Sequence, residues 1–181
     1  MKQPDRQITG IKIMPDLNTV RIKLASIVSS DGEGEEDAEN IIGNQFVITG
    51  KHRPHKDFVD AMKKLRKSGL ELLEIVTESV TDWTVQEVSI SGDIVMHQSR
   101  VVMTLGKKVK RTDKVATIKT PQTAMYPEKE DDQRYAGAEA MSKQIETCID
   151  EAIAYLNGKY ETDDGQLPLF PFEQLETNFT K

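Results

Sequence analysis

The sequence predicts a single α+β domain: a mostly antiparallel sheet of hairpin-linked strands, two helices and a flexible C-terminal tail. Three observations lead to this prediction. Six or seven short segments alternate apolar and polar residues, and most are separated by turn sequences. Two longer segments repeat apolar residues every three or four positions, as helices do. After residue 160 the chain is acidic and interrupted by prolines. We therefore assign residues 1–160 to the domain and 161–181 to the tail.

The first strands are expected to form a hairpin over residues 8–14 and 19–28, because both segments alternate around the turn sequence Pro-Asp-Leu-Asn. Alternation places Arg21 and Lys23 on the outward face of the second strand, with Lys12 beside them.

An exposed acidic loop is expected over residues 29–44, which are rich in glycine and acidic side chains. Residues 44–50 are then expected to form a short strand. A helix follows over 53–69, with Pro54 near its first turn and Ser68-Gly69 as its C-cap. For residues 70–80 the pattern leaves a strand and a second helix equally open.

The next strands are expected over residues 83–91 and 94–106, joined by the two-residue turn Gly92-Asp93. A basic turn over 107–114 leads to a strand over 115–120. The last helix is expected from about Gln133 to Asn157. Cys148 lies on its apolar stripe and is expected to be a small core residue.

Composition indicates a soluble protein of a reducing, cytoplasmic compartment. The chain has a single cysteine, shows no secretory apolar segment at its N-terminus, and contains no apolar run near the roughly 20 residues that cross a bilayer. The net charge of −6 is unevenly distributed. Residues 128–181 hold 5 basic and 13 acidic side chains, whereas residues 1–30 and 41–127 together hold 19 basic and 11 acidic ones. A basic body therefore carries an acidic loop and an acidic C-terminal third.

The basic body is a candidate for contact with nucleic-acid phosphates. The six residues that we select for this contact are Arg21, Lys23, Lys107, Lys108, Lys110 and Arg111. Binding of single-stranded DNA also uses exposed aromatic side chains, but Trp83 and Phe46 lie in strands, where burial is expected. The alternative is an ordinary solvated charged surface.

Sequence motifs for catalysis are missing, and we expect no cofactor and no metal. Neither a phosphate-binding loop nor a dinucleotide fingerprint occurs. His52, His55 and Asp57 could in principle hold a metal ion, although the start of a helix explains the same segment more simply.

The tail contains Gln166, Leu167, Pro168, Leu169 and Phe170. This pentapeptide resembles the Gln-Leu-x-Leu-Phe motif with which bacterial replication and repair proteins bind the sliding clamp, and only the proline at the variable position departs from the common form. The resemblance covers five residues. It implies that Leu169 and Phe170 fill an apolar pocket of the clamp, and that Gln166 makes polar contacts at the edge of this pocket. The alternative is that the apolar tail packs on its own domain.

A basic domain with an acidic, partner-binding tail is also similar in layout to single-stranded-DNA-binding proteins. The sequence therefore favours a non-enzymatic accessory protein of DNA replication or repair, of phage or bacterial origin. Two other classes stay open. One is a metal-dependent enzyme acting on nucleic acid, and the other is a structural or assembly protein whose tail docks on itself or on a neighbouring subunit.

Overall fold

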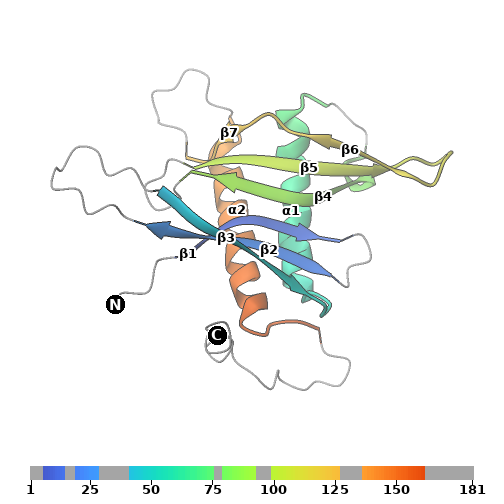
Figure 1. The fold of residues 1–181 in the computed structure, drawn as a ribbon. Coiled ribbons are helices and arrows are strands. Elements are labelled where there is room, and N and C mark those ends of the chain that lie inside the picture. The colour runs from blue at the N-terminus through green and yellow to red at the C-terminus, as the bar shows by residue number, and fades with distance from the viewer. Residues whose placement is uncertain are drawn as a thin grey trace.

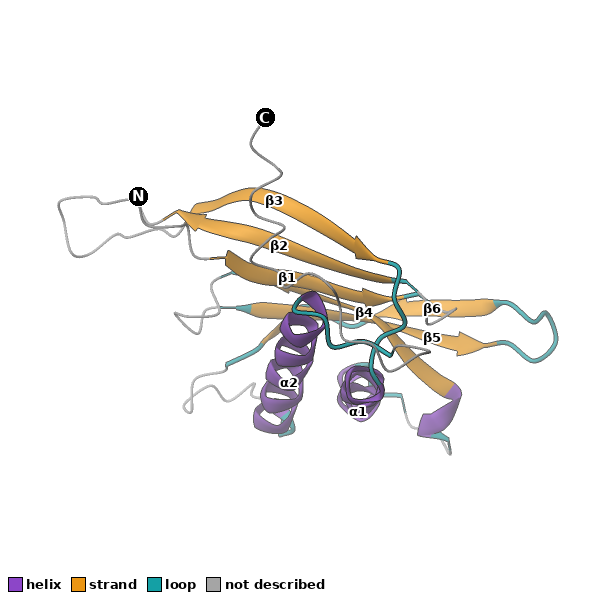
Figure 2. Cartoon of the chain, turned by 90° about the horizontal axis from the view of Figure 1, so that it is seen from below, coloured by secondary structure: helices purple, strands orange, loops and turns teal. Residues whose placement is uncertain are grey.

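A computed structural model describes residues 6–14, 19–28, 41–75, 79–92, 99–126 and 136–161. Within these residues, seven strands form one sheet, and two helices lie side by side on one of its faces (Figures 1 and 2). All strand pairs are antiparallel. The predicted α+β fold is confirmed.

The sheet combines two similar halves. Its strands are β1 (Arg6–Ile13), β2 (Val20–Val28), β3 (Ile41–Gly50), β4 (Trp83–Ser91), β5 (Arg100–Lys108), β6 (Val115–Lys119) and β7 (Thr123–Ala124). Their spatial order is β3-β2-β1-β4-β5-β6, and β7 pairs with the other end of β5. A helix follows each set of three strands: α1 (Lys56–Leu72) after β3, and α2 (Ala138–Leu156) after β6 and β7. A single turn of 3₁₀ helix, η1 (Val80–Asp82), precedes β4. Because β1 pairs with β4, the two halves meet at the centre of the sheet.

The core lies between the helices and one face of the sheet. Alternation along the strands directs Ile11, Ile22 and Met103 toward the helices, which contribute Leu65 and Ile145 from their apolar stripes. Each of these five side chains is at most 1% exposed. The opposite face of the sheet carries most of the charged and polar strand residues, together with apolar ones such as Val47 and Val115. Within the described residues, both helices lie on the other face, as is common for antiparallel sheets.

The prediction of a two-residue turn between β4 and β5 is wrong. Gly92 does have the positive φ of such a turn, at 83°, but Ser91 pairs with Arg100 rather than with Ile94. A two-residue turn would have placed His97 opposite the buried Val88. The observed register instead brings the apolar side chains of β5 into the core. Burial of one apolar face has fixed the register here, rather than the preference of the turn sequence.

The first helix ends later than predicted. It begins after His55 and continues through Gly69 to Leu72, where Glu74 has a φ of 54°. Gly69 is a position of close contact inside the helix rather than a C-cap, since a Cβ there would lie 2.9 Å from Cδ1 of Leu105 on the sheet. The loss of helix propensity at this glycine is accompanied by closer packing of α1 on β5.

Three smaller differences concern element ends. Residues 41–43, predicted as part of the acidic loop alone, belong to β3. The last helix begins at Ala138 rather than near Gln133, and the two-residue β7 was not predicted. The rest of the acidic loop, residues 29–40, lies outside the described residues, as does the tail from residue 162 onward.

Candidate nucleic-acid interface

The face of the sheet opposite the helices forms a basic surface, which we call the open face. Its charged strand residues are Lys12, Arg21, Lys23, Glu87, Arg100, Lys108 and Lys119. The strand register places Arg21, Lys12, Glu87, Thr104 and Lys119 in one row across five strands. Figure 2 shows both helices on the other side of the sheet.

The charge balance on the open face is strongly positive. The described strand residues of this face include six cationic side chains and one carboxylate. Arg21, Arg100 and Lys119 form no ion pair with any residue that the structure describes. Lys108 lies 2.6 Å from the Asp113 carboxylate in the following turn. Within the described part of the chain, three cations of this face therefore have no carboxylate partner.

Glu87 organises the centre of this face. Its carboxylate lies 3.5 Å from Lys12 Nζ and 3.2 Å from Lys23 Nζ. Lys23 reaches it across β1 at Gly10, where an added Cβ would lie 3.0 Å from Cδ of Lys23. Partial burial acts to raise the pKa of Glu87, but the hydrogen bond and charge of Lys23, together with the charge of Lys12, lower it below its usual value. Glu87 is thus ionised at neutral pH and competes with external anions for both lysines.

The structure separates the six residues selected from the sequence. Arg21, Lys23 and Lys108 lie on the open face. Lys107 lies on the side of the helices instead, with its Nζ 5.4 Å from the centroid of the Trp83 ring. Lys110 and Arg111 are exposed in the turn between β5 and β6, which projects from one end of the sheet (Figure 1).

Two open-face cations were missed by the sequence analysis. Arg100 and Lys119 are isolated cations in strands whose other residues are mostly apolar or uncharged, so neither stands in a basic cluster of the sequence. The signal that could have found them is alternation, because neighbouring side chains of a strand point to opposite faces. Arg100 is next to the buried Val101 and Lys119 is next to the buried Thr120, so both cations point away from the core.

The aromatic side chains do not form a stacking surface on the open face. Phe46 was predicted to be buried, which is wrong: it is 47% exposed on the side of the helices, and the guanidinium carbon of Arg6 lies 5.9 Å from its ring centroid. Trp83 is half-buried on that same side. Among the described residues of the open face none is aromatic, so this face is suited to charged groups rather than to unstacked bases.

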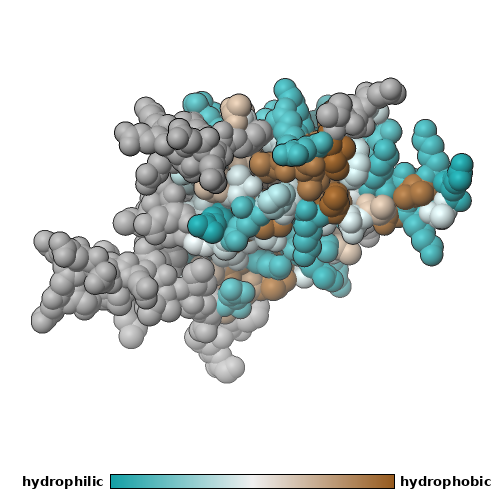
Figure 3. All heavy atoms as spheres, turned by 90° about the horizontal axis from the view of Figure 1, so that it is seen from above, coloured by the Kyte–Doolittle hydropathy of each residue, from teal (hydrophilic) through white to brown (hydrophobic). Residues whose placement is uncertain are grey.

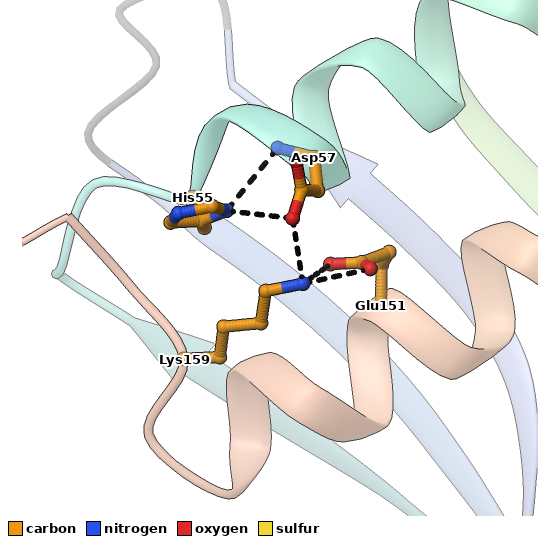
Figure 4. A network of polar contacts seen from close by, with 4 residues as sticks. All are labelled: His55, Asp57, Glu151 and Lys159. Carbon is orange, nitrogen blue, oxygen red and sulfur yellow. Dashed lines mark hydrogen bonds and ion pairs between the residues drawn. The ribbon is translucent and has the colours of Figure 1, made fainter.

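The segment considered for a metal site forms an ion-pair network (Figure 4). The Asp57 carboxylate lies 3.2 Å from His55 Nδ1 and 2.9 Å from Lys159 Nζ, and Lys159 also contacts both oxygens of Glu151 at 2.9 Å. The hydrogen bond from Lys159 lowers the pKa of Asp57. The Asp57 carboxylate, which a metal ion at this segment would need as a ligand, is therefore already paired with the ammonium group of Lys159. In the part of the chain that the structure describes, no group of three His, Cys, Asp or Glu side chains is arranged to hold a metal.

The other two candidate reactive groups have structural roles. The His52 ring stacks on Tyr160, with centroids 4.2 Å apart, and the His52 carbonyl accepts a hydrogen bond from the Tyr155 hydroxyl at 2.8 Å. Cys148 is fully buried, as predicted, and burial raises the pKa of its thiol to about 12. The thiol is therefore protonated and shielded at neutral pH.

Comparison of the chain with protein-family models, with curated proteins and with solved structures finds no match. Neither helix of the described residues has the length and apolar character that crossing a membrane requires. The clamp-type residues Gln166, Leu167, Leu169 and Phe170 lie outside the described residues. The open face is thus the site for which the structure provides geometry.

Proposed function

We propose that this chain is a non-enzymatic accessory protein of DNA replication or repair. Its open face binds the DNA backbone, and its tail binds a bacterial sliding clamp. The observation that carries the first part is the charge balance of the open face, with six cations and one carboxylate on a chain whose net charge is −6. The second part depends on the sequence from Gln166 to Phe170.

Backbone phosphates are the ligand that this surface fits best. Arg21 and Lys119 lie at opposite ends of one row across the sheet, so the cations are spread over the surface rather than converging on one point. A small anion needs converging donors, whereas a polyanion can contact several separated cations at once. Because the described open face has no aromatic side chain, binding should depend strongly on salt and weakly on base sequence.

The double variant Arg21→Ala/Lys119→Ala tests this function. It removes two cations that form no ion pair with a described residue, so no carboxylate on the face is left without its partner. We expect the slope of log K against log salt to become shallower by about 1.4 for single-stranded DNA and about 1.8 for duplex DNA. Fluorescence anisotropy with labelled oligonucleotides between 50 and 200 mM salt, roughly the range in which phosphate contacts are most visible, measures this slope.

The matched control is Lys63→Ala/Lys67→Ala on α1, which makes the same change in net charge. Both lysines are paired with carboxylates of the same helix, Asp60 and Glu71, on the side of the molecule that carries the helices. The control should bind DNA like the unaltered protein. An equal loss in both variants would mean that only net charge matters, and DNA binding that neither variant changes would place the contact elsewhere.

A second prediction concerns Glu87. Glu87→Gln removes the carboxylate that engages Lys12 and Lys23, so both lysines become available to phosphates. We expect DNA to bind more tightly, with a slope steeper by about 1 to 2, because up to two further phosphate contacts form. The same anisotropy titration measures this effect. Weaker binding by the Gln variant would show that Glu87 positions the lysines for DNA rather than competing with it.

A further inference from the structure

We propose that the outer edge of β6 binds a second copy of this chain, so that one sheet continues across both copies. This inference does not depend on DNA binding. It rests on three features of β6: backbone groups that have no partner among the described residues, exposed apolar side chains, and a sequence that is complementary to itself when two copies are antiparallel.

The first feature is the direction of the backbone groups of β6. Just before the strand, the Lys114 carbonyl accepts from the Val109 amide at 2.8 Å. Just after it, the Thr120 amide donates to the Met103 carbonyl at 2.9 Å. Along a strand of an antiparallel pair, residues whose backbone N–H and C=O groups bond to the neighbouring strand alternate with residues whose groups point the other way. The backbone groups of the even-numbered residues between these two bonds therefore point toward β5. The backbone groups of Val115, Thr117 and Lys119 consequently point away from the sheet. β6 is the last strand on this side of the described sheet.

The second feature is apolar exposure at this edge. All five residues of β6 are exposed, including Val115 at 46% and Ile118 at 39%. Val109, where the turn before β6 begins, is exposed as well. Figure 3 looks onto this side of the molecule and shows apolar side chains gathered between hydrophilic ones. Natural sheet edges are usually protected by charge, proline or a covering element. Here Pro121 lies just beyond the strand, and β6 itself carries a single charge, on Lys119.

The third feature is the pairing that two copies would make. Their free backbone groups bond when Thr117 lies opposite Thr117 of the second copy. Val115 then lies opposite Lys119, and on the other side of the sheet Ala116 lies opposite Ile118. Like charges do not face each other in this register, and each apolar side chain meets an apolar group or an aliphatic stem. Because every contact occurs twice, the interface closes with two-fold symmetry.

This arrangement has a consequence for the open face. The two-fold axis of such a pair is perpendicular to the sheet, so the open faces of both copies lie on the same side. The basic surface would double in length, with the Lys119 side chains of both copies near the junction. An interface built on a five-residue strand is small, so we expect a weak dimer with a Kd of roughly 10 to 100 μM.

Sedimentation equilibrium over protein concentrations spanning this range, without DNA, tests the proposal. The mass should rise from 20.4 kDa toward twice that value as concentration increases. Thr117→Pro should remain monomeric at every concentration. The proline removes an outward N–H at the centre of the edge and leaves the bonds between β5 and β6 in place. A chain that is monomeric throughout, or a proline variant that associates like the unaltered chain, would overturn the proposal.

A charge-matched pair of variants adds a test that does not involve proline. Ile118→Lys places a like charge at the edge of β6 in each copy, whereas Val47→Lys makes the same change at an exposed residue of β3, the other edge strand. We expect Ile118→Lys to weaken association at least tenfold and Val47→Lys to leave it unchanged. The reverse pattern would assign the interface to β3 and overturn the proposal. Circular dichroism of each variant confirms that the fold is retained.

Discussion

Replacing Gly50 with valine is expected to reduce the free energy of unfolding by about 2–4 kcal/mol. Gly50 ends β3, and the ring of Tyr155 from α2 lies directly against it. A Cβ at position 50 would overlap the Tyr155 hydroxyl and lie 2.6 Å from its Cε1. The ring is buried beside Phe58, with centroids 6.0 Å apart, so it can move only by disturbing the core. Displacing it would also break the hydrogen bond from Tyr155 to the His52 carbonyl.

Urea unfolding measures this effect, and Thr49→Val is the control. Thr49 is exposed one residue earlier on the same strand, so its replacement should change the free energy of unfolding by less than about 0.5 kcal/mol. Combining Gly50→Val with Tyr155→Ala should cost clearly less than the sum of the two single changes, because the clash is then absent. If the costs were additive, or if the Gly50→Val variant were as stable as the control, the packing of the Tyr155 ring would not require the space that Gly50 leaves.

Much of the fold could be predicted because local patterns and tertiary burial agree over most of the chain. The alternation in β1 and β2 and the apolar stripe of α2 each place residues in the core that the structure confirms, Ile22 and Cys148 among them. The errors occur where local and tertiary signals conflict. Gly69 carries the signal of a helix end but provides space for Leu105, and Gly92-Asp93 carries the signal of a tight turn that the core register overrides.

The joining of the two halves into one sheet could not be seen in the sequence. It is produced by the pairing of β1 with β4, which joins residues about 75 positions apart and leaves no local pattern. The same limit applies to the open face. Arg21 and Lys23 could be selected because they alternate within one strand, whereas Arg100 and Lys119 join them only through the order of strands in the sheet. Sequence clusters instead favoured Lys107, which contacts Trp83 on the other side.

The open face and the tail have opposite charge, and this is the reason to test them separately. Residues 128–181 carry 13 acidic and 5 basic side chains, so a DNA-binding defect alone could arise from either region. The open-face variant Arg21→Ala/Lys119→Ala should therefore bind a sliding clamp as tightly as the unaltered chain. A variant of the tail pentapeptide should, in turn, bind DNA unchanged.

For the tail, we expect a bacterial sliding clamp to bind the full-length chain with micromolar affinity, and the variant Gln166→Ala/Leu169→Ala/Phe170→Ala to lose this binding. Two large apolar side chains buried in a pocket contribute roughly 3–6 kcal/mol before ordering costs, so their removal should weaken binding by at least about 100-fold. Pro168 and Pro171 fix their own φ near −65° and disfavour helix, which lowers the cost of binding in an extended form. Isothermal titration calorimetry with purified clamp measures the affinity.

The control for the tail is Phe172→Ala/Leu175→Ala/Phe179→Ala, which removes three large apolar side chains outside the pentapeptide. If the order Gln-Leu-x-Leu-Phe is what the clamp recognises, this control should keep affinity within several-fold of the unaltered chain. An equal loss in both variants would mean that general apolar character, rather than the motif, drives the contact. If the clamp binds neither the chain nor its variants, the proposed role in replication and repair is wrong. The proposal that the open face binds DNA would be unaffected, because it depends on the sheet alone.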